Sequence, residues 1–157
     1  MKYAMLLMLA MFGCATDALD GPVVYVVGDD VDAAIEGVSA WEPIGFYATA
    51  DDPGLPECGR HAYDGGDPCQ ITVAVFRDPR LLELAHTNGM SDRTHRTIWV
   101  DAAVDAYATR YTLAHEFGHI LLDTATHTHG GIMGASTYWM IDVDYELACI
   151  ELGRGCK

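Results

Sequence analysis

The chain has 157 residues, half of them apolar, with a formal net charge of −14 and only 9 Lys and Arg side chains. A chain of this length and composition forms one globular domain with a core of its own, which argues against intrinsic disorder. The excess of acidic side chains argues against nucleic acid as a partner, because binding to phosphates requires clustered basic residues.

The first 14 residues have the pattern of an export signal. Lys2 precedes an apolar run over residues 3–12, which is shorter than the roughly 20 residues of a membrane span and is typical of a signal peptide. The run ends in a sequence that resembles a bacterial lipobox, in which Cys14 would become a lipidated first residue, although Phe12 is an unusual occupant. The alternative is simple secretion with cleavage near Ala15.

This signal divides the chain into a signal peptide over residues 1–14, a linker over 15–22 and one folded domain over 23–157. We expect an exported monomer, either a lipoprotein of the bacterial cell envelope or a secreted protein. Its only contact with a membrane would be through the lipid at Cys14.

The four remaining cysteines predict disulfides, because their number is even and an exported protein folds in an oxidising compartment. Four cysteines permit three pairings. The local pairing joins Cys58 to Cys69 and Cys149 to Cys156, which would close one loop and tie down the C-terminal tail. Zinc binding by these thiols is the alternative, but the chain has no C-x-x-C pair.

Strands and helices are expected to alternate along the first two thirds of the domain. Apolar spacing predicts a helix from Val31 to Val38, with Asp29 or Asp30 as its cap and Pro43 after its end. A helical turn is expected after Pro79, and residues 86–96 have the composition of a polar loop. Runs of β-branched and aromatic residues predict strands at residues 23–27, 44–49, 71–76 and 97–100.

A longer helix is expected to begin between Asp101 and Asp105 and to end at Leu122 or Asp123. It is apolar over much of its girth, which indicates that it is buried. It carries the motif His115-Glu116-Phe117-Gly118-His119.

In a helix, residues four apart project from the same side, so His115 and His119 can share one zinc ion. Glu116 can then act as a general base on a zinc-bound water. Gly118 costs a helix about 1 kcal/mol relative to Ala, which indicates a close neighbour over that turn. The alternative is two histidines on an amphipathic helix with an incidental glutamate.

The loop after this helix offers two further imidazoles, His127 and His129. A catalytic zinc site commonly takes three protein ligands and keeps a fourth position open for water. Either histidine could be the third ligand if the loop folds back under the helix.

With this loop, the sequence resembles the metzincin class of zinc metalloproteases, which carries H-E-x-x-H-x-x-G-x-x-H followed by a methionine turn. The glycine and the third histidine of that pattern fall at Leu122 and Ala125 here. A longer Thr-rich loop must therefore turn the chain, which favours His127 as the third ligand, with His129 in reserve. Met133 matches the methionine of the turn, a hydrophobic floor beneath the metal.

The resemblance implies an α+β fold, in which a twisted mixed β-sheet is packed by two long helices. Residues 31–41 are similar to the first helix of the family. Residues 142–152 are similar to its C-terminal helix, with Ile141, Tyr145, Ala148 and Leu152 on one face and Gly153 at its end. In a thermolysin-like site, Glu146 of that helix would replace the loop histidine.

The resemblance also implies a zinc-dependent metalloendopeptidase that cleaves peptide or protein substrates with Glu116 as the general base. Tyr138 is a candidate for contacting the oxyanion, and a packed tyrosine is its alternative. Two other functions stay open: an exported zinc-containing binding protein without turnover, and a zinc buffer that uses the His-rich loop.

Overall fold

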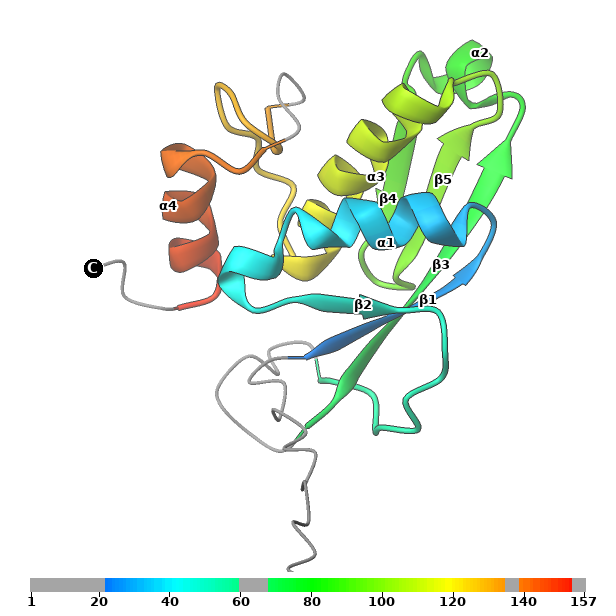
Figure 1. The fold of residues 1–157 in the computed structure, drawn as a ribbon. Coiled ribbons are helices and arrows are strands. Elements are labelled where there is room, and N and C mark those ends of the chain that lie inside the picture. The colour runs from blue at the N-terminus through cyan, green and yellow to red at the C-terminus, as the bar shows by residue number, and fades with distance from the viewer. Residues whose placement is uncertain (1–21, 60–67, 135–138, 154–157) are drawn as a thin grey trace, which may run out of the picture.

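The structure, a computed structural model, describes residues 22–59, 68–134 and 139–153. Within these ranges it has one five-stranded sheet, with helices packed against one face (Figure 1). The elements in chain order are β1 (Val23–Gly28), α1 (Val31–Ser39), the short 3-10 helix η1 (Glu42–Ile44), β2 (Tyr47–Thr49), β3 (Gln70–Asp78), α2 (Leu81–Ala85), β4 (Gly89–Asp92), β5 (Thr97–Asp101), α3 (Ala106–Leu121) and α4 (Asp142–Glu151).

The sheet has the strand order β2-β1-β3-β5-β4. The first four strands in this order are parallel to their neighbours, and β4 pairs with β5 in the antiparallel direction. The sheet is therefore mixed, and the α+β class expected from the sequence is confirmed. β4 lies at one edge, directly beside α3.

The core lies between one face of the sheet and the two helices α1 and α3. Alternate residues along each strand face these helices, because side chains in a strand point to opposite sides. Trp41 is fully buried in this core, and its indole Nε1 donates a hydrogen bond to the carbonyl of Ala114 in α3 at 2.8 Å. Other core residues include Val24, Val26, Val38, Ile71, Val73, Val75, Ile98, Val100, Leu113 and Phe117.

Two segments differ from the sequence-based expectation. The strand predicted over residues 44–49 is limited to β2, because Ile44 belongs to η1 and Gly45 takes a left-handed conformation with φ of 90°. Residues 86–96, predicted to be a polar loop, include the strand β4. This strand is only four residues long and contains no apolar run. It forms because its backbone pairs with that of β5.

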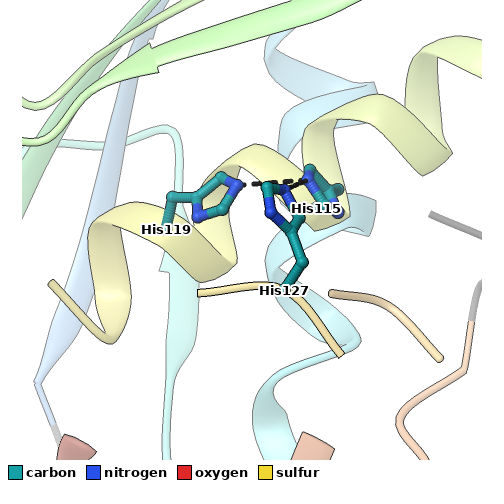
Figure 2. Close-up of side chains that lie close together, drawn as sticks. All are labelled: His115, His119 and His127. Atoms are coloured by element: carbon teal, nitrogen blue, oxygen red, sulfur yellow. Dashed lines mark hydrogen bonds between the residues drawn. The ribbon is translucent and has the colours of Figure 1, made fainter. Parts of the chain in front are cut away.

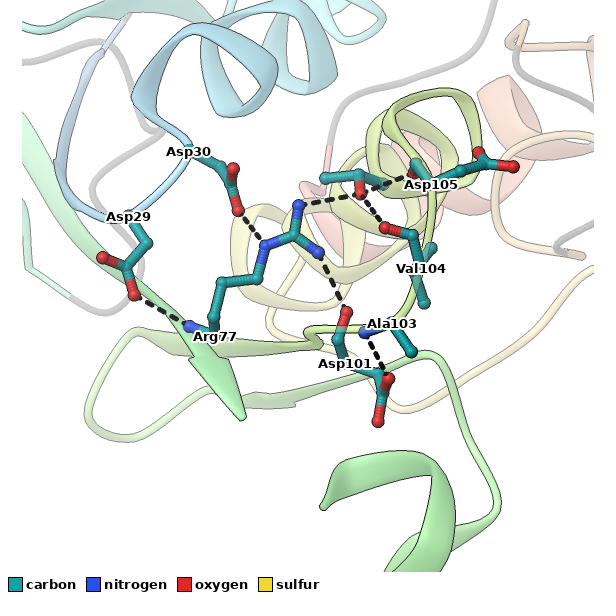
Figure 3. A network of polar contacts seen from close by, with 8 residues as sticks. Asp29, Asp30, Arg77, Asp101, Ala103, Val104 and Asp105 are labelled. Atoms are coloured by element: carbon teal, nitrogen blue, oxygen red, sulfur yellow. Dashed lines mark hydrogen bonds and ion pairs between the residues drawn. The ribbon is translucent and has the colours of Figure 1, made fainter. Parts of the chain in front are cut away.

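Arg77 of β3 joins the sheet to both core helices (Figure 3). Its guanidinium group pairs with Asp30 and donates hydrogen bonds to the carbonyl of Asp101 at 2.9 Å and to the hydroxyl of Thr109 in α3 at 3.0 Å. Asp30 lies at the N-cap position of α1, as expected, but its side chain makes no capping hydrogen bond. Its carboxylate pairs with Arg77 instead.

The structure contains a disulfide between Cys58 and Cys69, as the local pairing predicted. Cys149 is also disulfide-bonded, while Cys156 lies outside the described residues. The predicted signal peptide and the predicted lipidation site Cys14 lie outside them too. Among the described residues, no helix has the length and apolar character that crossing a membrane requires.

Candidate metal centre

Helix α3 presents two imidazoles from consecutive turns of its C-terminal half. His119 is buried and His115 is partly buried. The Nδ1 atom of His115 lies 2.8 Å from the carbonyl oxygen of Ile132, and the Nδ1 atom of His119 lies 2.9 Å from that of Thr124. A ring nitrogen that faces a carbonyl carries the proton, so both Nε2 atoms are left with a lone pair.

The chain reverses direction directly after α3. Leu122 is the C-cap, and Asp123 follows in the left-handed conformation with φ of 48°, which Asp tolerates better than most side chains. The backbone N–H of Thr124 then donates to the carbonyl of His119 at 3.1 Å. The loop therefore runs back along the helix and brings His127 to the two helical histidines.

The three imidazoles of His115, His119 and His127 converge on one point (Figure 2). The Nε2 atom of His115 lies 3.1 Å from that of His119 and 3.2 Å from that of His127. The ring of His127 is stacked on His115 with an interplanar angle of 15° and is nearly perpendicular to His119 at 85°. Nitrogen lone pairs this close repel one another unless a cation lies between them.

This donor set fits a divalent metal ion. Two ligands at about 2.0–2.1 Å from a tetrahedral ion are separated by roughly 3.3 Å, close to the Nε2 separations above. The backbone carbonyls of Ile132 and Thr124 fix the ring orientations from outside, as such partners commonly do for histidine ligands. Burial lowers the pKa of His119 to about 4, which keeps this imidazole neutral and able to bind a metal at neutral pH.

A methionine packs beneath the helical turn that carries the histidines. Met133 is fully buried in the turn over residues 131–134. A Cβ atom at Gly118 would collide with the Sδ atom of Met133 and with the ring of Trp41. This explains the glycine inside the motif helix, where the sequence predicted a close neighbour.

The same turn is held by a buried carboxylate of α4. Asp144 accepts hydrogen bonds from the backbone N–H groups of Ile132 at 3.0 Å, Met133 at 3.2 Å and Ile141 at 3.1 Å, and from the hydroxyl of Thr128 at 2.9 Å. Asp144 is completely buried. It therefore links α4 to the loop whose Ile132 carbonyl orients His115.

Glu116 lies beside the cluster, with its carboxylate under the edge strand β4. It is buried, and its Oε2 atom accepts a hydrogen bond from the hydroxyl of Ser91 at 2.7 Å. Burial raises the pKa of Glu116, while the Ser91 hydrogen bond and the nearby His127 oppose that rise. Its carboxylate therefore holds a proton more readily than an exposed glutamate does.

A cleft of about 560 Å³ leads to Glu116 and His115. One wall is the N-terminal half of α3, and the other is the segment that leads into β4. The residues that line it are His86, Thr87, Asn88, Gly89, Tyr107, Ala108, Tyr111, Thr112, His115 and Glu116. A substrate group in this cleft would lie directly beside the carboxylate.

The remaining candidates from the sequence lie elsewhere. His129 is exposed and does not belong to the cluster, and Glu146 is exposed on α4. Tyr138 lies outside the described residues. Two residues that contact the site were not singled out from the sequence, Ser91 and Asp144. Recognising β4 as a strand would have pointed to Ser91 as a neighbour of α3. No local sequence pattern points to Asp144.

Comparisons with known proteins found no relative. No family model matches the chain, and no curated protein and no solved structure matches it. The resemblance to the metzincins therefore depends on residues 115–133, and what it implies for function is a proposal.

Proposed function

We propose that the protein is a zinc-dependent peptidase, in which His115, His119 and His127 hold one zinc ion and Glu116 is the general base. One observation carries the proposal: three imidazole nitrogens face one another beside a buried carboxylate that is not part of their cluster. A site that only stored a metal would have no need for that carboxylate.

Zinc is the metal that this donor set favours. Three imidazole ligands suit zinc, copper, iron and nickel, and zinc sites with three protein ligands keep a fourth position for water. A bound zinc ion would lower the pKa of a coordinated water to about 7 and would polarise the carbonyl of the substrate.

The residues around this position would carry the proton. Glu116 would accept it from the attacking water and deliver it to the amine that leaves the cleaved peptide. Its burial raises its pKa, which makes the carboxylate a stronger base for the first transfer, while its hydrogen bond to Ser91 stabilises the charged form that must be present before that transfer.

The surroundings of the site fit an extended polypeptide. β4 is an edge strand of the sheet, so its outer backbone groups can pair with a substrate strand. The cleft beside it offers Tyr107, Tyr111 and Thr112 of α3 to one substrate side chain. The substrate would therefore lie along β4, with its scissile carbonyl above the histidines.

We also propose that the protein is exported as a monomer. The Cys58–Cys69 disulfide supports this location, because disulfides persist in oxidising compartments. Lipidation at Cys14 is the proposed means of attachment to the bacterial cell envelope, and mass spectrometry of the mature protein would detect the lipid.

The proposed function is tested by replacing the general base. We expect Glu116→Gln to retain one zinc per chain and to lose cleavage of a peptide library by at least roughly 100-fold, the usual contribution of a positioned base. Glu146→Gln on the exposed face of α4 is the matched control and should behave as the wild type.

Unchanged cleavage in Glu116→Gln would exclude this residue as the base. A wild type that holds one zinc and cleaves no peptide would favour the alternative, an exported zinc-containing binding protein without turnover. Cleavage that a chelator stops and added zinc restores is the result that supports the proposal.

A further inference from the structure

Ser91 approaches the proposed general base from a strand that supplies no metal ligand. In the antiparallel pair of β4 and β5, Ser91 lies opposite Ile98, which is fully buried against the helices. Residues directly opposite each other project to the same face of a sheet, so Ser91 also faces α3. Met90, the next residue along β4, projects to the other face and is 46% exposed.

The backbone of β4 lies close enough to α3 for this contact to form. A Cβ atom at Gly89 would collide with Thr112 and would lie 3.1 Å from Cγ of Glu116. The glycine therefore permits an approach that any larger residue would block. This approach sets the 2.7 Å distance between the hydroxyl of Ser91 and Oε2 of Glu116.

The hydrogen bond makes the two carboxylate oxygens unequal. Oε2 accepts the proton of Ser91, whereas Oε1 accepts no hydrogen bond from the described part of the chain. No enclosed side-chain oxygen or nitrogen among the described residues lacks a partner, so Oε1 keeps access to solvent. Because Glu116 lines the cleft, Oε1 is the oxygen available to a water molecule there.

We propose that Ser91 is a positioning residue that holds the carboxylate of Glu116 so that Oε1 faces the attacking water. This inference rests on the proposed peptidase function. A glutamate side chain rotates about several bonds, and a base is effective only when it lies within hydrogen-bond reach of the proton it removes. A single donor on β4 therefore determines how often the base is correctly oriented.

The first test compares three variants by peptide cleavage. Ser91→Ala should lower kcat roughly 10-fold or more and leave KM within about twofold, since the hydroxyl orients the base and does not bind the substrate. Ser91→Thr keeps a hydroxyl and should recover most of kcat. Ser39→Ala, an exposed serine at the end of α1, should match the wild type.

The second test uses the metal-free protein and does not depend on activity. A double-mutant cycle with Ser91→Ala and Glu116→Ala in urea unfolding should show coupling between the two residues. We expect Ser91→Ala to lower the unfolding midpoint in the wild-type background and to have a smaller effect once Glu116 is removed.

The outcomes separate the two proposals. An unchanged kcat in Ser91→Ala, or a low kcat that Ser91→Thr does not recover, would overturn the role of Ser91 and leave the peptidase intact. Additive effects in the cycle would also overturn it. A wild type without any cleavage would overturn both the peptidase and the catalytic role of this hydrogen bond.

Discussion

Asp144→Asn should destabilise the protein although the two side chains have nearly the same shape. The buried carboxylate accepts four hydrogen bonds, three of them from backbone N–H groups. An asparagine keeps one acceptor oxygen and turns an NH₂ group toward donors that the other oxygen had served. The asparagine loses least when its NH₂ group takes the place of Oδ1, because it can then donate to the hydroxyl of Thr128. The N–H of Met133 still loses its acceptor.

The magnitude follows from these contacts. Hydrogen bonds to a charged group contribute about 1.5–3 kcal/mol each, and a buried donor without a partner costs about 1–3 kcal/mol. Losing one bond and weakening the others therefore lowers the free energy of unfolding by about 2–4 kcal/mol. That is a large fraction of the roughly 5–15 kcal/mol that keeps a domain folded.

Urea unfolding of the metal-free protein, followed by far-UV circular dichroism, measures this loss. The control is Asp142→Asn, an exposed acidic residue in the first turn of the same helix, which should cost less than about 1 kcal/mol. Zinc affinity should also fall in Asp144→Asn, by roughly 10–100-fold, because Ile132, whose carbonyl orients His115, moves when it loses its contact with Asp144. A free energy of unfolding within about 0.5 kcal/mol of the wild type would refute the reasoning.

Three further predictions concern the site and its support. Burial lowers the pKa of His119 to about 4 from an ordinary value of 6.5, so the unfolded chain binds this proton first as the pH falls. The metal-free protein should lose stability between about pH 6.5 and 4, and equal urea midpoints at pH 7 and 5 would contradict this. Gly118→Ala should lower the free energy of unfolding by about 1–3 kcal/mol despite its better helix propensity, because the new methyl group meets Met133. This loss of free energy should be smaller when Met133→Ala is combined with Gly118→Ala. If Gly118→Ala alone stabilised the protein, the predicted collision with Met133 would be excluded. Tyr111→Ala should widen the cleft and shift cleavage of a peptide library toward bulkier side chains at one position, whereas an unchanged preference would show that this wall does not contact the substrate.

The sequence predicted the central strands and the helix α3 well, because their local patterns agree with their places in the fold. Runs such as Val23–Gly28 are buried on the helix-facing side of the sheet, so apolar composition identifies them. β4 has no such pattern. Its four residues form a strand only because β5 offers backbone partners. A prediction from the local sequence pattern does not include this pairing, so it misses the strand.

The C-terminal helix shows the same distinction. Its range was predicted closely, and Gly153 ends it with φ of 63°. Ile141, however, was expected on the packed face and is 39% exposed. Asp144, near the helix start, is fully buried instead and accepts hydrogen bonds from residues that lie 11 to 16 positions earlier in the chain.

The candidate site was predictable to the extent that it lies within one helix. The spacing of His115 and His119 places them on one side of α3 by geometry alone. The choice between His127 and His129 depended on where the chain would turn. It turns at Asp123, which has a left-handed conformation, and the loop that follows places His127 in the cluster. The hydrogen bond between Ser91 of β4 and Glu116 of α3 joins residues that lie 25 positions apart in the chain. No spacing rule predicts such a contact.

Zinc titration of the histidine variants against a competing chelator tests the central claim most directly. We expect the wild type to bind one zinc per chain and His127→Ala to bind it at least roughly 100-fold more weakly, since a ligand is lost. His129→Ala, with the same change two residues away in an exposed position, should stay within about twofold of the wild type. Equal losses in both variants, or a larger loss in His129→Ala, would contradict the three-histidine site.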